Sequence, residues 1–306
     1  MNIYRSFEEA AGIRNPVVTT GSFDGVHIGH KTILRRLKML AEIHNGESVL
    51  ITFDPHPRKV LYPETAGKDL KLINSHEEKL ELLSRAGLDN LIIIEFTREF
   101  SHVTSEQFVR DYLCGILNAK VIVVGFNHHF GFNKEGDYKH LWNWQGKYGF
   151  LAEEIPEQEV QNETVSSTKI RKAISEGYIQ RANAYLDHYF IVMGIPGQIL
   201  NLHQNELPAL YSLPVTDECK LLPSPGIYAV SAQMGTFRSK AMALVHAGQN
   251  NMPDLCVNFF DDITLPSEFP MILSFHKKIH GAVILSEEKY IPRILSAKED
   301  INELIF

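Results

Sequence analysis

Two histidines and three glycines fall within the ten-residue segment GSFDGVHIGH, residues 21–30. Glycines let a backbone approach a ligand closely, and histidines three positions apart at the start of a helix can share one face. Such imidazoles can donate hydrogen bonds to phosphoryl oxygens and, when protonated, add positive charge. The segment therefore predicts a phosphate site in which His27 and His30 act on the ligand.

Zinc binding is the rival interpretation of this histidine spacing. Two histidines are too few for a zinc site, and the sequence places no further ligand near His27 and His30. A helix start with surface histidines is the simplest alternative. A lone His-x-x-His favours that alternative, whereas the whole ten-residue pattern at a strand–helix junction favours a functional site.

The sequence around this segment alternates between strand-like and helix-like stretches. Apolar, β-branched runs predict strands, and amphipathic patterns between them predict helices. Near-continuous apolar strands between such helices indicate a parallel sheet covered on both faces. The predicted strands are residues 15–20, 48–53, 90–96 and 120–126, and the predicted helices are residues 30–43, 75–87, 104–117 and 169–186.

Residues 21–30 follow the first predicted strand directly and lead into the first predicted helix. A glycine-rich turn at such a junction is where α/β proteins bind phosphates, because backbone N–H groups point outward and the helix dipole favours negative charge. The backbone at Gly21, Gly25 and Gly29 can come close to a ligand there. Neither GxxxxGK[ST] nor GxGxxG is present, so the turn belongs to neither common class of phosphate loop.

Beyond about residue 187 the pattern changes to short apolar or alternating segments separated by Pro, Gly, Asn and Asp. This is typical of an antiparallel barrel or sandwich. A terminal helix is predicted over residues 285–305, kinked or divided at Pro292. We therefore expect two domains, residues 1–186 and 187–306. The predicted strands of the second lie within residues 188–200, 224–233, 239–248, 255–262 and 269–279.

Composition narrows the class of protein. A length of 306 residues suits about two domains, and the net charge of −7 gives no reason to expect a nucleic-acid partner. Cys114, Cys219 and Cys256 are scattered and odd in number, which argues against a disulfide framework and suits a reducing cytoplasm. Charged residues come too early for a signal peptide, and no apolar run is long enough to span a membrane. We expect a cytoplasmic protein without a membrane partner.

Two further segments place polar groups where ligands bind. TFDPHP (residues 52–57) ends a predicted strand, so Asp54 and His56 fall at the carboxyl edge of the sheet. VSSTKIR (residues 165–171) places hydroxyl groups, Lys169 and Arg171 at a helix start, where the dipole favours anions. A proline-terminated strand and an ordinary N-cap are the alternatives for these segments.

Taken in order, these motifs resemble the FMN adenylyltransferase module of bacterial bifunctional riboflavin kinase/FMN adenylyltransferases, also called FAD synthetases. GSFDGVHIGH resembles the HxGH-type signature of nucleotidyltransferases, and TFDPHP, VVGFNHHFGFNKEGD (residues 123–137) and VSSTKIR follow as in that family. The resemblance covers about residues 15–185 specifically and continues more weakly beyond. It implies an N-terminal Rossmann-like α/β domain with a parallel sheet, followed by a C-terminal riboflavin-kinase-like antiparallel β-barrel with a terminal helix.

The resemblance also implies a reaction, ATP + FMN → FAD + pyrophosphate, by in-line attack of an FMN phosphate oxygen on the α-phosphorus. Mg²⁺ would accompany ATP, with no protein ligand assigned to it. The implied catalytic residues are His27, His30 and Arg171. The implied ATP-binding residues are Gly21, Phe23, Gly29, Ser166, Ser167 and Thr168, and the implied flavin-binding residues are Phe53, Asp54, His56 and Asn127.

The second domain departs from the kinases of that family. They carry a PTAN motif near the start of the barrel, and residues 194–214 contain none. Their catalytic Glu, and the His two residues later, align with Cys256 and Asn258. A cysteine on an apolar strand predicts a buried, inert thiol, so we expect a kinase-like barrel without kinase activity. Two alternatives stay open: a fully bifunctional enzyme with a shifted kinase motif, and a non-catalytic flavin- or nucleotide-binding regulator.

Overall fold

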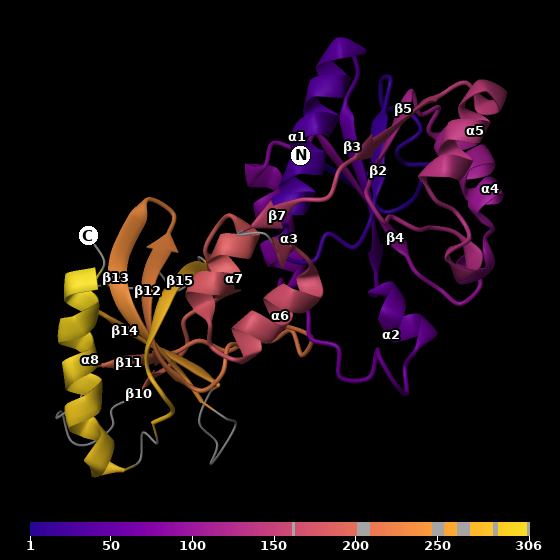
Figure 1. Ribbon diagram of the computed structural model, residues 1–306. Helices are drawn as coiled ribbons and strands as arrows, with labels where there is room; N and C mark the ends of the chain where they lie inside the picture. Colours follow the sequence, from indigo (N-terminus) through magenta and orange to yellow (C-terminus); the bar gives the residue numbers. More distant parts are fainter. Residues whose placement is uncertain (161–162, 201–208, 247–253, 262–269, 284–286, 305–306) are drawn as a thin grey trace. The chain divides into compact units, whose positions relative to one another are not determined.

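The computed structural model describes residues 1–160, 163–200, 209–246, 254–261, 270–283 and 287–304. The chain forms two compact units (Figure 1). The first contains Met1–Leu70 and Lys79–Val165, and the second contains Lys71–Glu78 and Ser166–Phe306.

The first unit is built on a six-stranded parallel sheet in the order β1-β4-β3-β2-β5-β6. The four predicted strands are confirmed as β2 to β5. The sequence did not indicate β1 and β6, because β1 is a short edge strand and β6 carries two glutamates. The strands are β1 Asn2–Tyr4, β2 Val17–Thr20, β3 Ser48–Asp54, β4 Asn90–Glu95, β5 Val121–Gly125 and β6 Leu151–Ile155.

Helices cover both faces of this sheet, as expected for a parallel sheet. Helix α1 (Ile28–Ile43) packs on β2, β3 and β5 through Leu34, Leu37 and Leu40. Figure 1 shows α4 (Ser105–Gln107) and α5 (Tyr138–Tyr148) on the opposite side. Further helical segments of this unit are α2 Pro57–Leu61, most of α3 (His76–Arg85), η1 Phe100–His102, η2 Phe108–Ile116 and η3 Phe132–Lys134, and β7 Glu159–Val160 pairs with β8 Glu163–Thr164.

The predicted helix over residues 104–117 is confirmed and begins where its sequence indicates. The Thr104 hydroxyl accepts a hydrogen bond from the Gln107 backbone, and the Gln107 side chain accepts one from the Thr104 backbone. This reciprocal pair is a capping box, which satisfies two helix-terminal N–H groups. The following turns widen into the π-helical segment η2, whose Phe108 and Leu113 join the core beneath the sheet.

The strand order reverses at β2. The chain runs outward from β2 through β3 to β4, and β5 then returns to pair with the other side of β2. This is a topological switch point, and ligands of open α/β sheets bind at the carboxyl ends of the strands beside it. The loop of residues 21–27 leaves β2 at this end.

The second unit contains a seven-stranded antiparallel sheet in the order β10-β11-β14-β13-β12-β15-β9. The edge strands β9 and β10 are joined by residues 195–198 alone. Such a link spans at most about 18 Å, whereas the edges of a flat sheet of this size lie about 29 Å apart. The sheet must therefore curl, which agrees with the predicted barrel. The strands are β9 Phe190–Gly194, β10 Ile199–Leu200, β11 Leu210–Ser212, β12 Gly226–Met234, β13 Phe237–Val245, β14 Leu255–Phe259 and β15 Met271–His280.

The predicted terminal helix is confirmed as α8 (Ile291–Leu304), preceded by the 3₁₀ turn η5 (Glu288–Tyr290). Ile294, Ala297 and Ile301 pack into the core of the curled sheet. Pro292 lies in the first turn of α8, where its missing N–H breaks no helical hydrogen bond. The proline thus divides the segment and does not kink a continuous helix.

The two compact units divide at Val165, earlier than the boundary at residue 186 that the change of pattern predicts. Helices α6 (Ser167–Ser175) and α7 (Ile179–Leu186) belong to the second unit. Two hydrogen bonds of Asn183 hold α7 in the second unit. Its amide donates to the Phe275 carbonyl at 2.9 Å, and its side-chain oxygen accepts from the Phe190 N–H at 2.7 Å. These bonds tie α7 to β15 and β9. The assignment of separate functions to residues 1–186 and 187–306 stays a prediction.

Residues 71–78, which include the start of α3 (His76–Arg85), are held in the second unit by a buried ion pair. The Lys220 ammonium lies 2.5 Å from Glu78 Oε2, and both side chains are 1% exposed. Lys220 also donates to the carbonyls of Ile73 and Ile191. The other Glu78 oxygen accepts from the Met193 N–H. All three ammonium hydrogens thus have acceptors, as a buried charge requires.

We expect Lys220→Met to destabilise the second unit by about 3–5 kcal/mol, because the Glu78 carboxylate would then be buried without its cation. The measurement is the free energy of unfolding in urea. The double variant Lys220→Met with Glu78→Gln should be more stable than Lys220→Met alone. Equal stability of the single and double variants would contradict the ion-pair explanation.

Candidate active site

The loop after β2 has an unusual backbone. Phe23 and Val26 have φ angles of 47° and 41°, and Gly25 has a φ of 90°. Positive φ is uncommon outside glycine and is an outlier for a β-branched residue such as valine. Strained backbone of this kind is concentrated at functional sites.

Three rings stack at the junction of this loop with α1. The His27 and His30 rings are 3.7 Å apart at 18°, and the Phe23 ring stacks on the other side of His30 at 4.3 Å and 22°. The prediction that the two histidines share one face is therefore confirmed. The glycines make room for the rings, since a Cβ on Gly21 would lie 3.1 Å from Phe23 and a Cβ on Gly29 would lie 3.2 Å from His27.

Electrostatics keep His30 neutral. Its pKa lies well below the usual 6.5, chiefly because of burial and further because of the neighbouring His27 and Lys79. Within the part of the chain that the structure describes, the buried Nδ1 atom of His30 has no hydrogen-bond partner. At neutral pH the His30 imidazole is therefore uncharged, with one N–H donor and one acceptor nitrogen.

Lys79 is a candidate functional residue that the sequence analysis missed. It lies on α3, and the carboxylates of Asp24 and Asp54 interact with it electrostatically. Burial lowers the pKa of Lys79, and the two carboxylates act in the opposite direction. Since Lys79 also influences His30, it brings a cation to the electrostatic surroundings of the histidine pair. One sequence feature could have indicated Lys79. It lies three and four positions before the buried Leu82 and Leu83, so it shares their face of the helix.

His128, in the loop after β5, is a second residue that the analysis did not single out. Its Nε2 lies 3.1 Å from the hydroxyl of Thr20, the last residue of β2. Burial, and to a smaller extent the adjacent His129, lower the pKa of His128 to about 4. The bond joins the loop after β5 to the end of β2 at the switch point. Neighbouring Asn127 is exposed with a φ of 62°, so its backbone conformation alone accounts for the asparagine.

The predicted flavin-binding residues on β3 and α2 lie at the carboxyl end of the sheet. Phe53 is partly buried and packs beside Phe96 and Phe100, with ring centroids 5.5 and 5.8 Å away. Asp54 is exposed at the end of β3. His56 caps α2, and its Nδ1 accepts from the backbone of Arg58 at 3.2 Å. The aromatic group offers an apolar wall for a planar ligand, and the flavin roles of Phe53, Asp54, His56 and Asn127 stay predictions.

The residues predicted to hold the triphosphate begin α6. Ser166 is its N-cap and accepts from the Lys169 N–H at 3.4 Å, so the ordinary N-cap alternative describes Ser166 correctly. Arg171 donates to the Thr168 hydroxyl at 3.3 Å. Ser166, Ser167, Thr168 and Arg171 all belong to the second unit, and their joint action with His27 and His30 stays a prediction.

The positions aligned with the kinase base are unsuited to that role. Cys256 is fully buried beside Leu244 and Ile294, and burial raises the pKa of its thiol to about 12. The Asn258 amide donates to the Ala209 carbonyl at 2.9 Å. Residues 201–208, where PTAN is absent from the sequence, and Asp262 lie outside the described residues.

A strained glycine-rich turn with a histidine pair, placed at the switch point of a parallel sheet, is the arrangement of a nucleotide-binding α/β protein. Comparison with known proteins defines the family. The FAD synthetase family model matches residues 10–169, and the chain belongs to this family.

Relatives match across both units. A bifunctional riboflavin kinase/FMN adenylyltransferase from Listeria monocytogenes is 31% identical over 272 residues, which cover 87% of this chain and 81% of the relative. An FAD synthetase from the same organism is 34% identical over 198 residues, 64% of this chain and 79% of the relative. The crystal structure of a macrolide-efflux protein from Streptococcus pneumoniae is similar with a TM-score of 0.80 and 25% identity, covering 98% of this chain and 97% of that one.

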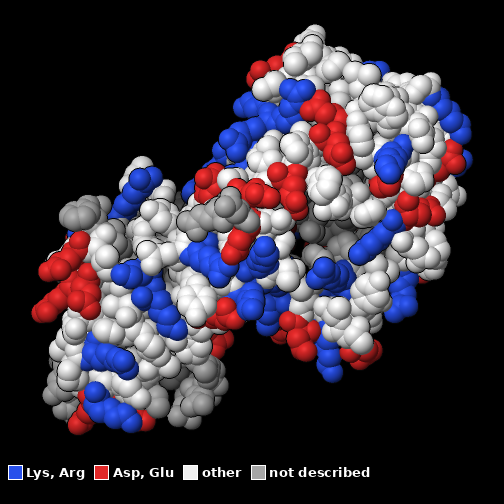
Figure 2. Space-filling model, in the orientation of Figure 1, with Lys and Arg blue, Asp and Glu red and all other residues white. Residues whose placement is uncertain are grey.

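The described helices include none that is long and apolar enough to cross a membrane. Figure 2 shows Lys and Arg side chains interspersed with Asp and Glu over the face in view.

We expect the first unit to lose stability as pH falls from about 6.5 toward 4. The folded-state pKa of His128 is depressed to about 4, so the unfolded chain takes up this proton first. The stability that depends on neutral His128 is fully present above about pH 6.5 and is lost progressively as the pH falls toward 4. His128→Gln, which can still bond Thr20, should show a smaller pH dependence of the urea unfolding free energy. His44→Gln, at the end of α1, is the matched control, and an identical pH dependence in both variants would exclude His128 as the source.

Proposed function

We propose that the protein is an FMN adenylyltransferase, which makes FAD and pyrophosphate from FMN and ATP. The observation that carries this proposal is the stacked His27–His30 pair at the switch point of the parallel sheet. Family membership supports it, since relatives are named for FMN adenylyltransferase and FAD synthetase activity.

The proposed chemistry needs no covalent protein intermediate. An FMN phosphate oxygen attacks the α-phosphorus of ATP in line, the bond to the β-phosphate oxygen breaks, and pyrophosphate leaves with the electron pair. Catalysis then depends on positioning and on stabilising the charge that moves to the leaving group. His27 and His30 donate hydrogen bonds to the phosphates, and Lys79 supplies positive charge nearby. Arg171 and residues 166–168 hold the β- and γ-phosphates.

Magnesium would enter with ATP. Among the described residues there is no group of three or more His, Cys, Asp or Glu side chains that could hold a metal ion. A site with few protein ligands suits Mg²⁺, because proteins commonly hold Mg²⁺ through substrate phosphates and only one or two carboxylates. Bound Mg²⁺ would neutralise phosphate charge, and Asp24 and Asp54 are the carboxylates beside Lys79.

We further propose that the second unit does not phosphorylate riboflavin. The position of the family's base is taken by Cys256, whose thiol stays protonated in the core. Without a base the riboflavin hydroxyl keeps its proton, and without PTAN the triphosphate lacks its ligands.

Incubation of purified protein with Mg-ATP and either FMN or riboflavin tests both proposals, with products separated by chromatography. We expect FAD and pyrophosphate from FMN, and no FMN from riboflavin. Failure of the folded protein to make FAD would overturn the adenylyltransferase proposal and favour a binding regulator. FMN formation from riboflavin at a rate comparable with FAD synthesis would establish the bifunctional alternative.

His30→Ala should lower kcat/KM for FAD synthesis by roughly tenfold to a thousandfold, as expected for a lost donor to the transition state. Steady-state kinetics and the melting temperature should be measured together. His140→Ala, at a partly exposed position on α5, is the control. Activity close to wild type in His30→Ala, with an unchanged melting temperature, would show that the His30 ring has no catalytic role.

A further inference from the structure

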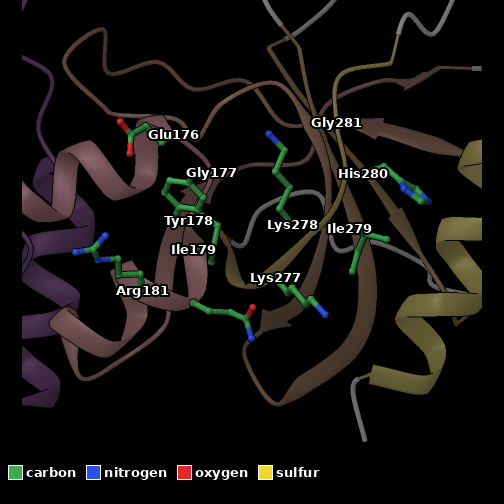
Figure 3. Close-up of a pocket in the computed structure, with 11 residues that line it drawn as sticks. Glu176, Gly177, Tyr178, Ile179, Arg181, Lys277, Lys278, Ile279, His280 and Gly281 are labelled. Carbon is green, nitrogen blue, oxygen red and sulfur yellow. The ribbon is translucent and has the colours of Figure 1, made fainter. Parts of the chain in front are cut away.

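The second unit contains a cavity of about 570 Å³ that the proposed reaction does not use. One wall is formed by residues 176–181, where α6 gives way to α7, and the other by residues 277–281 at the end of β15 (Figure 3). A cavity of this volume admits a small molecule. A reactive group on either wall is therefore within reach of small reagents.

Two consecutive lysines of β15 line this cavity and differ in their surroundings. Successive side chains of a strand point to opposite faces of the sheet, and Figure 3 shows Lys277 and Lys278 pointing apart. Lys277 is exposed. Lys278 is partly buried and pairs across the sheet with Tyr228, whose ring centroid lies 5.6 Å from the Lys278 nitrogen. The two lysines thus form a natural comparison within one strand.

The Lys278 side chain is held against the cavity wall. Its ammonium donates to the Ser224 hydroxyl at 2.7 Å. A Cβ on Gly177 would lie 3.0 Å from the ammonium nitrogen, and a Cβ on Gly226 would lie 2.6 Å from Cε. The side chain therefore passes between two residues that have no side chain. Because Gly177 lines the cavity, the Lys278 nitrogen lies at that wall.

Few contacts favour the charged form of Lys278. Within the part of the chain that the structure describes, no carboxylate forms an ion pair with its ammonium, and the Glu176 carboxylate of the same cavity lies 3.9 Å from Lys172. The Ser224 hydroxyl is a neutral acceptor. Burial, with no opposing charge, lowers the pKa of Lys278. More of this amine is consequently deprotonated at a given pH than for a lysine in water.

A deprotonated amine at the wall of a cavity is a nucleophile, and lysines react in this form when burial lowers their pKa. A small acyl phosphate presents a carbonyl carbon that the amine nitrogen can attack. The C–N bond forms, and the bond from the carbonyl carbon to the phosphate oxygen breaks. Phosphate leaves with that electron pair, and the amine proton goes to solvent. The product is an uncharged amide.

The amide product suits the surroundings of Lys278. Its N–H can still donate to the Ser224 hydroxyl, and its acyl group can occupy the cavity. Loss of the charge also removes the cost of keeping a partly buried ammonium without a counter-ion.

We propose that Lys278 is an acylation site, at which small acyl phosphates that enter the cavity modify the side-chain nitrogen. The position of the nitrogen between Gly177 and Gly226, at the cavity wall and beside the Ser224 hydroxyl, carries the proposal. The site lies wholly within the second unit and does not depend on the proposed adenylyltransferase reaction.

Acetyl phosphate tests this proposal on the full-length protein, without ATP or flavin. The protein is incubated with acetyl phosphate and with free N-α-acetyl-lysine amide as an internal standard. It is then digested with chymotrypsin, and peptide fragmentation in the mass spectrometer measures acetylation of each lysine separately. We expect Lys278 to be acetylated several-fold faster than Lys277. Its rate should also level off at a lower pH than that of the free standard, because its pKa is lowered.

The same reaction in urea is the control for the fold. Once the chain is unfolded the cavity is lost, and we expect Lys277 and Lys278 to react at similar rates. Two matched variants identify the modified residue. Lys278→Arg should remove the fast acetylation, whereas Lys277→Arg should leave the rate at Lys278 unchanged.

Two results would overturn the proposal. One is acetylation of Lys278 at the same rate as Lys277, or more slowly, in the folded protein. The other is a preference for Lys278 that persists in urea, since the reactivity would then come from the local sequence and not from the cavity. Both results come from the wild-type chain, so neither depends on whether a variant folds. Neither involves FAD synthesis, so the proposed function stands or fails separately.

Discussion

The close packing of three rings over two glycines is the constraint on which the candidate active site depends. A side chain at Gly21 or Gly29 would press on Phe23 or His27, and the stack would open. The same packing requires the chain to reverse sharply between β2 and α1, which explains the positive φ angles of Phe23 and Val26. The conformation of the loop, the start of α1 and the orientation of the two histidines therefore depend on one another. It lies where the strand order of the sheet reverses, and a phosphate can approach the N–H groups of α1 there.

The sequence predicted the elements whose patterns are local. Strands β2 to β5 are nearly continuous apolar runs, and α1 shows its buried stripe directly. The histidine pair could be predicted because both residues belong to one short segment. Lys79 and His128 could not, because each approaches the loop from a distant part of the chain, and only the sheet topology brings them together. The glycines were expected to let the backbone approach a ligand. The structure shows that Gly21 and Gly29 leave space for the rings of Phe23 and His27.

The second unit shows why the compact units divide at a different residue from the change of sequence pattern. The sequence pattern changes where helices give way to antiparallel strands. The division into compact units depends instead on hydrogen bonds and on a buried ion pair. Asn183 ties α7 to β9 and β15, and Lys220 holds residues 71–78 through Glu78. The bonds from Asn183 to Phe275 and from Lys220 to Glu78 join residues that are 92 and 142 positions apart, so no local sequence pattern predicts them. A buried ion pair of this kind adds little net stability, but removal of either partner is costly. The ion pair therefore favours packing of residues 71–78, which carry Glu78, in the second unit.

The low pKa of His30 also constrains any mechanism at this site. Two imidazolium rings 3.7 Å apart would repel each other by about 4 kcal/mol at an effective dielectric constant of about 20. Burial and Lys79 oppose protonation of His30 in the same direction. The doubly charged pair is therefore not populated before a ligand arrives. In the proposed reaction a bound triphosphate would act in the opposite direction, since its negative charge favours the imidazolium form. Phosphate binding would then be linked to proton uptake, and the positive charge would develop beside the leaving pyrophosphate.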